Sequence, residues 1–245
     1  MTDINQLQVQ IKENLEIVQE QIASAAKRGR RDSGDVKLIT VSKKKSIEAM
    51  RAAVHAGITL FGENYPEETV GKMDILTQEF PCLEWHMIGH LQSRKTQLVA
   101  ERFDMMHSLD SVRLANKLGS ALTACRRKLP VLLEMNVSGE ESKGGWAAWD
   151  EAYWELLIPD IEQVLAVDSL VVRGLMSMPP LTEDAEKTRP YFILLRQLRN
   201  WLAKKFPQTD WGELSMGTST DFEVAIEEGA TFVRIGTAIL GARAY

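Results

Sequence analysis

The sequence has little of what marks secreted or membrane proteins. Among its 245 residues are only two cysteines, Cys82 and Cys125, which cannot build a disulfide framework and form no Cys-x-x-Cys pair. No apolar run approaches the roughly 20 residues that span a bilayer. The first residues also lack the basic start and apolar centre of a signal peptide. We therefore expect a cytoplasmic protein that has no membrane partner.

Motifs for several common ligands are missing as well. Neither GxGxxG nor a P-loop pattern occurs, which weakens a nucleotide-binding interpretation. His86 and His90 lie four residues apart, but outside the expected helices and without a set of carboxylates, so we expect no metal site. The net charge of −5 gives no electrostatic reason to expect nucleic acid as a partner.

Strand and helix patterns alternate along the chain with regular spacing. Short apolar runs predict strands at 37–42, 59–63, 84–89, 104–109, 131–137, 170–177, 213–216 and 232–235. Helical patterns fill the gaps, at 46–57, 65–78, 93–101, 111–126, 148–166, 183–206 and 220–229. Strands separated by helices favour an all-parallel sheet, and eight strands close a single (β/α)₈ TIM barrel. A doubly wound open sheet is the alternative.

A further helix is expected before the first strand. Its apolar residues recur every three or four positions, at Ile4, Leu7, Ile11, Leu15, Val18, Ile22 and Ala25. Thr2 or Asp3 can cap its start, and basic residues near its end suit the helix dipole. We expect residues 1–31 to form a long N-terminal helix packed on the barrel, and residues 1–245 to form one domain, because no linker or composition shift divides the chain.

The first expected strand ends in a lysine, Lys43, which lies on the same face as Ile39 and Val41. Ligands of parallel α/β sheets and barrels bind at the carboxyl ends of the strands. A lysine held there can form a Schiff base with an aldehyde such as pyridoxal phosphate (PLP). The alternative is a solvated basic rim, because Lys44 and Lys45 follow directly.

The last two expected strands are followed by small and hydroxyl-bearing residues. Ser219, Gly236 and Thr237 lie where barrel enzymes commonly bind phosphate, although such residues are also typical of turns. Arg234 interrupts an otherwise apolar run, and a buried arginine needs a partner. That partner is either a ligand or an acidic residue on the neighbouring strand.

Seven segments together resemble the pyridoxal phosphate homeostasis proteins (the YggS/PROSC family). In chain order they are Val41-Ser42-Lys43, Phe61-Gly62-Glu63-Asn64-Tyr65, Trp85-His86-Met87-Ile88-Gly89, Leu91-Gln92, Arg173-Gly174-Leu175-Met176, Leu214-Ser215-Met216-Gly217 with Ser219 and Asp221, and Val233-Arg234-Ile235-Gly236. The matching region runs from Lys37 to Arg243. Ser46, Thr218 and His90 depart from residues common in the family, but none of them is an expected contact of the cofactor.

The resemblance implies an alanine racemase-like barrel of fold type III that binds PLP and has no second β domain. Carried over by position, Lys43 holds PLP as a Schiff base, Ser219, Gly236 and Thr237 hold its phosphate, and Arg234 faces the pyridine nitrogen. Asn64 lies in the segment that lines the cofactor ring, and His86 is a further candidate nearby. No catalytic residue is implied.

The resemblance also implies a role in vitamin B6 and amino-acid homeostasis without classical turnover. An arginine only donates hydrogen bonds, so Arg234 would keep the pyridine nitrogen unprotonated and weaken PLP as an electron sink. We expect a monomer, with apo-enzymes that require PLP as recipients. A single-domain PLP-dependent racemase or lyase is the main alternative, and a Schiff-base aldolase or a scaffold protein are others. The tryptophans between 146 and 154 have no assigned role.

Overall fold

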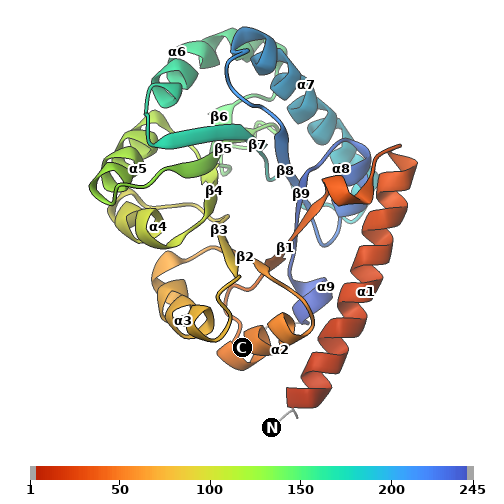
Figure 1. The fold of residues 1–245 in the computed structure, drawn as a ribbon. Coiled ribbons are helices and arrows are strands. Elements are labelled where there is room, and N and C mark those ends of the chain that lie inside the picture. The colour runs from red at the N-terminus through yellow and green to blue at the C-terminus, as the bar shows by residue number, and fades with distance from the viewer. Residues whose placement is uncertain (1–3, 242–245) are drawn as a thin grey trace.

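The alternation of strands and helices closes into a barrel. The computed structural model describes residues 4–241 and shows eight parallel strands around a central core (Figure 1). These are β1 (Lys37–Val41), β2 (Leu60–Glu63), β3 (Glu84–Met87), β4 (Met105–Leu109), β5 (Leu129–Asn136), β7 (Leu170–Met176), β8 (Glu213–Thr218) and β9 (Phe232–Ile235). The order is β4-β3-β2-β1-β9-β8-β7-β5, and β5 pairs with β4 to complete the ring. The predicted (β/α)₈ fold is confirmed.

Helices cover the outside of the barrel between successive strands (Figure 1). They are α2 (Ile47–His55), α3 (Pro66–Glu79), α4 (Thr96–Arg102), α5 (Val112–Ala124), α6 (Trp154–Leu165), α7 (Arg189–Lys205), α8 (Phe222–Glu227) and the short α9 (Thr237–Leu240). The predicted helices 148–166 and 183–206 begin later than expected. The side chains of Asp150 and Asp184 accept hydrogen bonds from the backbone two residues on, which gives a 3₁₀ turn before each helix.

The tryptophan-rich segment is a structural connection between β5 and α6. Trp146 and Ala147 form the short strand β6, which pairs with the end of β5 and was not predicted. The indole Nε1 of Trp146 donates to Asp160 Oδ2 at 2.9 Å, and Trp154 packs on Trp201 with ring centroids 5.7 Å apart. These contacts anchor the connection to α6 and α7, so packing accounts for these two tryptophans.

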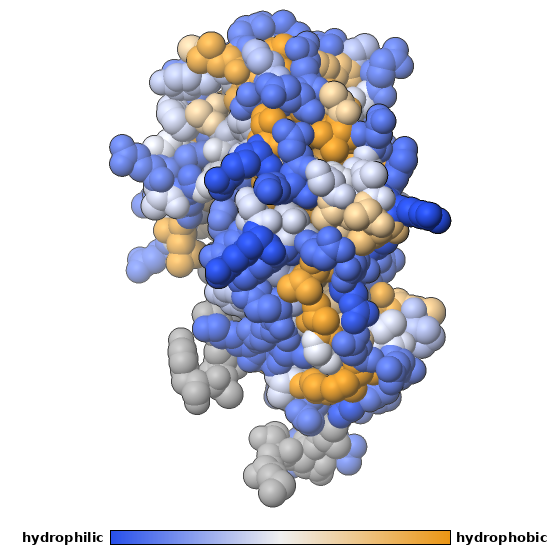
Figure 2. All heavy atoms as spheres, turned by 90° about the vertical axis from the view of Figure 1, so that its left-hand side faces the viewer, coloured by the Kyte–Doolittle hydropathy of each residue, from blue (hydrophilic) through white to orange (hydrophobic). Residues whose placement is uncertain are grey.

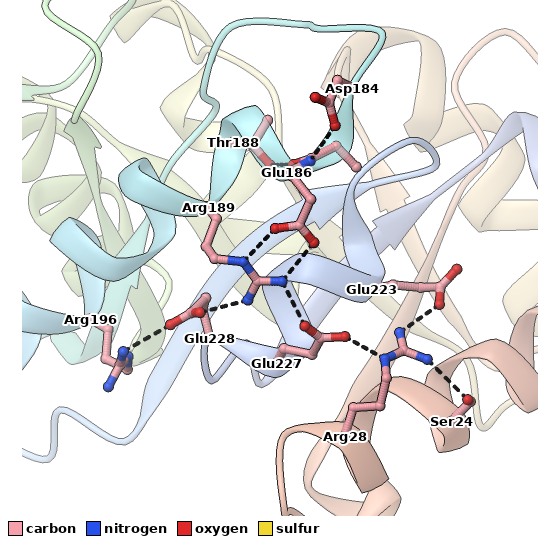
Figure 3. A network of polar contacts seen from close by, with 11 residues as sticks. Ser24, Arg28, Asp184, Glu186, Thr188, Arg189, Arg196, Glu223, Glu227 and Glu228 are labelled. Carbon is pink, nitrogen blue, oxygen red and sulfur yellow. Dashed lines mark hydrogen bonds and ion pairs between the residues drawn. The ribbon is translucent and has the colours of Figure 1, made fainter.

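Helix α1 (Ile4–Arg28) lies along one side of the barrel and contacts α2, α8 and α9 (Figure 1). Its predicted apolar stripe is buried, with Ile11, Leu15, Val18 and Ile22 each no more than 6% exposed. The predicted cap at Thr2 or Asp3 lies outside the described residues. The polar end of the helix is held by Arg28, which pairs with two glutamates of α8 (Figure 3).

The outer surface carries mixed polar and apolar groups. Figure 2 shows the side of the molecule that carries α4 and α5, where hydrophilic residues dominate and apolar residues gather only in small separate groups. Within residues 4–241, no helix has the length and apolar character needed to cross a membrane.

Candidate functional site

A cavity of about 370 Å³ lies at the carboxyl ends of the strands. Its walls come from the residues that end or follow β1, β2, β3, β7, β8 and β9, because parallel strands bring these ends to one rim. The lining residues are Val41, Lys43, Asn64, Ile88, Met178, Leu181, Thr218, Ser219, Thr220, Arg234, Gly236 and Thr237. Six of the seven residues predicted for the cofactor site therefore meet here: Lys43, Asn64, Ser219, Arg234, Gly236 and Thr237.

The three consecutive lysines have different surroundings. Lys43 lines the cavity, whereas Lys44 is exposed and has a left-handed backbone, with φ of 60°. Lys45 turns away and donates from Nζ to the carbonyl oxygens of Leu240 and Gly241, at 2.7 and 3.0 Å. Those carbonyls are at the carboxyl end of α9, where a cation is stabilised. Of the three, only Lys43 faces the site.

A buried carboxyl group supports the turn that carries Lys43. Ser42 is fully buried, and its Oγ donates to Glu63 Oε1 at 2.8 Å. Burial raises the pKa of the Glu63 carboxyl, while the bond from Ser42 opposes that shift. The second carboxyl oxygen has no hydrogen-bond partner among the described residues. This link fixes the end of β1 against the end of β2, directly before Lys43.

Arg234 is buried among neutral acceptors. It is 4% exposed and donates to Ser215 Oγ at 2.6 Å, to the Ser177 carbonyl at 2.9 Å and to Met178 Sδ at 3.0 Å. No ion pair in the described part of the chain joins it to a carboxylate. Burial lowers the pKa of the guanidinium to about 10, only partly offset by the more distant Asp221 and Glu134. Of the two partners considered from the sequence, a hydrogen-bonded acidic neighbour is absent among residues 4–241.

Asn64 lines the cavity and carries an uncompensated polar atom. Its Oδ1 is buried and has no hydrogen-bond partner within residues 4–241. Gly89 packs against it so closely that an added Cβ would lie 2.7 Å from the Asn64 Cα. A buried acceptor without a partner costs free energy.

Another part of the cavity wall is formed by hydroxyl groups and the start of α9. Ser219, Thr220 and Thr237 line it together with Gly236, which precedes the helix. Asp221 shapes the first of these loops, because its Oδ1 accepts from both the backbone N–H and the hydroxyl of Thr218, at 2.7 and 3.0 Å. Hydroxyl and backbone N–H donors at this edge of a barrel suit a phosphate group.

His86 is the predicted site residue that does not reach the cavity. It lines a separate cavity of about 510 Å³ at the amino ends of the strands, together with the first residues of β1, β3, β8 and β9. Ile88, two residues further on the same face of the chain, occupies the rim instead. His86 is therefore not expected to touch a ligand bound at the carboxyl ends.

Two interior residues that contact the site indirectly were missed. His107 and Ser215 are fully buried in β4 and β8, and Ser215 holds Arg234 directly. A polar residue within a run such as Met105-Met106-His107 was the available signal, since His107 shares a face with two apolar residues of the strand. Met178 follows β7, and its sulfur contacts the same guanidinium.

The chain resembles known proteins over nearly its whole length. Residues 10–244 match the family described as alanine racemase, N-terminal domain. A pyridoxal phosphate homeostasis protein of Vibrio cholerae is 42% identical, covering 96% of this chain and 97% of the relative. One of Pseudomonas aeruginosa is also 42% identical, covering 96% of each chain.

Solved structures agree with this assignment. PipY of Synechococcus elongatus, in a structure with PLP bound, has a TM-score of 0.81 and 33% identity, covering 95% of this chain and all of PipY. An alanine racemase of Clostridium difficile has a TM-score of 0.65 at 12% identity and covers 94% of this chain but 56% of the racemase, which shows a shared fold. This chain belongs to the family of pyridoxal phosphate homeostasis proteins, built on a barrel of the alanine racemase N-terminal type.

Proposed function

We propose that this protein binds PLP in the cavity at the carboxyl ends of the strands and serves in PLP homeostasis. The observation that carries the proposal is Arg234, a buried cation whose hydrogen-bond partners are all neutral, in the same cavity as Lys43. A buried cation without a hydrogen-bonded carboxylate is costly, and a ligand that accepts a hydrogen bond from it would offset part of that cost. The relatives named for PLP homeostasis, and the PipY structure with PLP bound, agree with this function.

The residues of the cavity fit the chemical groups of PLP. Lys43 would hold the aldehyde carbon covalently, and Ser219, Gly236 and Thr237 would bind the phosphate. Arg234 would donate to the pyridine nitrogen, and Asn64 would lie beside the ring. When bound, PLP supplies an electron sink that depends on protonation of this nitrogen. A guanidinium cannot supply that proton readily, because it is a donor that stays charged.

This arrangement favours storage or transfer of PLP over turnover of a substrate. We accordingly propose no catalytic residue, and PLP-requiring apo-enzymes as recipients. The monomeric state and the cytoplasmic location remain predictions. A racemase or lyase activity on the same barrel is the competing proposal.

The test is to add PLP to the purified protein, record its absorption spectrum, and reduce it with borohydride before mapping the labelled peptide by mass spectrometry. We expect a visible band that disappears on reduction, and a pyridoxyl group on Lys43. Lys43→Ala should abolish the label. Lys44→Ala is the matched control, because its side chain is the exposed neighbour and should leave labelling unchanged. A label on another lysine, or none at all, would refute the assignment.

The competing activity is tested on the same preparation. Each of a set of L-amino acids is incubated with the PLP-loaded protein, and chiral chromatography follows its depletion or racemisation. We expect no turnover above that of free PLP. Conversion that Lys43→Ala abolishes would establish the enzyme instead.

A further inference from the structure

A chain of hydrogen bonds runs through the barrel interior from Arg234 to the amino-terminal opening. Arg234 Nη1 lies 2.6 Å from Ser215 Oγ, which lies 2.8 Å from His107 Nδ1. His107 Nε2 in turn lies 3.0 Å from His86 Nδ1. All four side chains are buried, and the last of them lines the cavity at the amino ends of the strands. Neither His107 nor Ser215 lines the cavity proposed for PLP.

Hydrogen-bond chemistry gives this chain a direction. A guanidinium only donates, so Ser215 Oγ accepts from Arg234 and has its single proton to give to His107 Nδ1. His107 must then carry its proton on Nε2 and donate to His86 Nδ1. His86 carries its own proton on Nε2, which lies 3.9 Å from Glu84 Oε2 at the opening. Each bond then has one donor and one acceptor.

Electrostatics supports the same direction, and packing holds the rings in place. Burial lowers the pKa of His86 to about 3 and that of His107 well below its usual range, so both rings are neutral and each has one N–H. The opposite direction would make Ser215 Oγ accept from both Arg234 and His107, and would leave its own proton without an acceptor in the part of the chain that the structure describes. The Phe232 ring packs edge-on against both imidazoles, with centroids 5.7 Å from His86 and 5.0 Å from His107. The rings are thereby held in place.

We propose that three residues, Ser215, His107 and His86, act as positioning residues. They do not contact the ligand, and they act on it through Arg234. The directed chain fixes the guanidinium, together with the contacts to Ser177 and Met178. Nη1 and Nη2 both donate inside the protein, and within residues 4–241 Nε makes no hydrogen bond, so the guanidinium has further N–H groups to offer a ligand. This inference rests on the proposed function where it concerns PLP. The direction of the hydrogen-bond chain does not depend on PLP.

The direction is tested without any ligand. Long-range ¹H–¹⁵N correlation spectra of the histidine rings report which nitrogen carries the proton. The protein has four histidines, and His55→Gln and His90→Gln variants assign the other two by loss of their signals. We expect neutral rings protonated on Nε2 for both His86 and His107 near neutral pH. A proton on Nδ1 of either ring would overturn the directed chain.

The effect on the ligand is tested with two substitutions of one residue. His107→Leu breaks the chain, whereas His107→Gln keeps an acceptor toward Ser215 and a donor toward His86. We expect His107→Leu to raise the Kd for PLP up to about tenfold, the upper end of what one neutral hydrogen bond contributes. It should also shift the absorption maximum of bound PLP. His107→Gln should restore both toward the wild-type values.

The controls separate positioning from stability. His90→Leu changes an exposed histidine outside the chain and should alter neither affinity nor spectrum. Ser215→Ala removes the link at its other end and should weaken PLP binding similarly, which covers the case in which His107→Leu does not fold. Unchanged affinity and spectrum in folded His107→Leu or Ser215→Ala would overturn the positioning role. If wild-type protein takes up no PLP, the proposed function fails, and the ring tautomers still decide the direction of the chain.

Discussion

The guanidinium of Arg234 is held by the hydroxyl of Ser215 at 2.6 Å, where a carboxylate would normally be expected. A carboxylate would neutralise the arginine and leave it inert toward a ligand. A serine fixes the position of the group and leaves its charge uncompensated. The site is therefore prepared for an acceptor from outside the chain, which agrees with a role in holding PLP.

Arg234→Met should separate stability from ligand binding. Arg234 has no ion pair to lose within residues 4–241, so we expect the free energy of unfolding to change by less than about 3–5 kcal/mol, which is the cost of breaking a buried pair. Urea denaturation with and without excess PLP measures both effects. PLP should stabilise the wild-type protein by mass action, and Arg234→Met much less. A loss as large as that of a broken pair would contradict this description of Arg234.

The two interior histidines predict a loss of stability in mild acid. Their pKa is lowered by burial, so the unfolded chain binds protons below about pH 6.5 that the folded protein excludes. Stability therefore falls as pH decreases, by about 1.4 kcal/mol per histidine per pH unit. Burial raises the pKa of Glu63 and Glu134, and these residues act in the opposite direction. Urea denaturation at a series of pH values measures the slope.

A double variant isolates the contribution of the histidines. His86→Gln with His107→Gln keeps neutral hydrogen-bonding groups but cannot titrate, so its stability should fall less steeply between about pH 6.5 and 5. His90→Gln removes an exposed histidine and should keep the wild-type slope. Equal slopes in all three proteins would mean that the buried rings are not neutral.

The ion-pair network around Arg189 predicts coupling between α1, α7 and α8. Its guanidinium contacts Glu186, Glu227 and Glu228, and Arg28 of α1 shares Glu227 (Figure 3). We expect Arg189→Gln to cost about 1–2 kcal/mol, since two of the glutamates are only 19% and 12% exposed.

An isolated pair provides the comparison. Arg51 and Glu79 form a bidentate surface pair between α2 and α3, and Arg51→Gln should cost less than Arg189→Gln, because solvent screens an exposed pair. High salt should shrink both effects. Equal costs for the two variants at low salt would show that the network adds nothing to its separate pairs.

Gly174 lies in Arg173-Gly174-Leu175-Met176, one of the seven segments that resemble the family, and its backbone conformation requires glycine. Its φ is 150°, and an added Cβ would lie 1.8 Å from the carbonyl oxygen of Glu213 on the neighbouring strand. Gly174→Ala should therefore cost at least about 3 kcal/mol, from strain and from separation of β7 and β8. Gly57 also has a positive φ, of 101°, but open space around it, so Gly57→Ala should cost about 1 kcal/mol. Thermal unfolding compares the two, and similar losses would contradict the steric argument.

The sequence predicts the barrel well because every strand is an apolar run between helical patterns. The residues around the cavity follow from the same reasoning, since Lys43, Asn64 and Gly236 come directly after strands. The position of His86 away from this cavity has a physical cause. Alternate residues of β3 share a face, and the stagger between strands decides whether His86 or Ile88 reaches the rim. The stagger depends on the hydrogen-bond register across the whole barrel, and a local sequence pattern does not predict that register.

The 3₁₀ turns and β6 were missed for a different reason. The side chains of Asp150 and Asp184 accept hydrogen bonds from nearby backbone N–H groups, so the helices that follow begin later in the sequence. In the sequence this signal is weaker than the helical periodicity of the neighbouring residues. Strand β6 has only two residues and depends on the end of β5 for its pairing. Such elements form only once the surrounding structure exists.

The position of α1 bears on how the protein is synthesised. Its apolar face packs against α8 and α9, which the ribosome adds roughly 200 residues after α1 has been completed. At typical elongation rates this leaves the face of Ile11, Leu15 and Val18 without those partners for roughly 10 to 40 s. During that interval the nascent chain presents a long amphipathic helix, the kind of segment that chaperones bind.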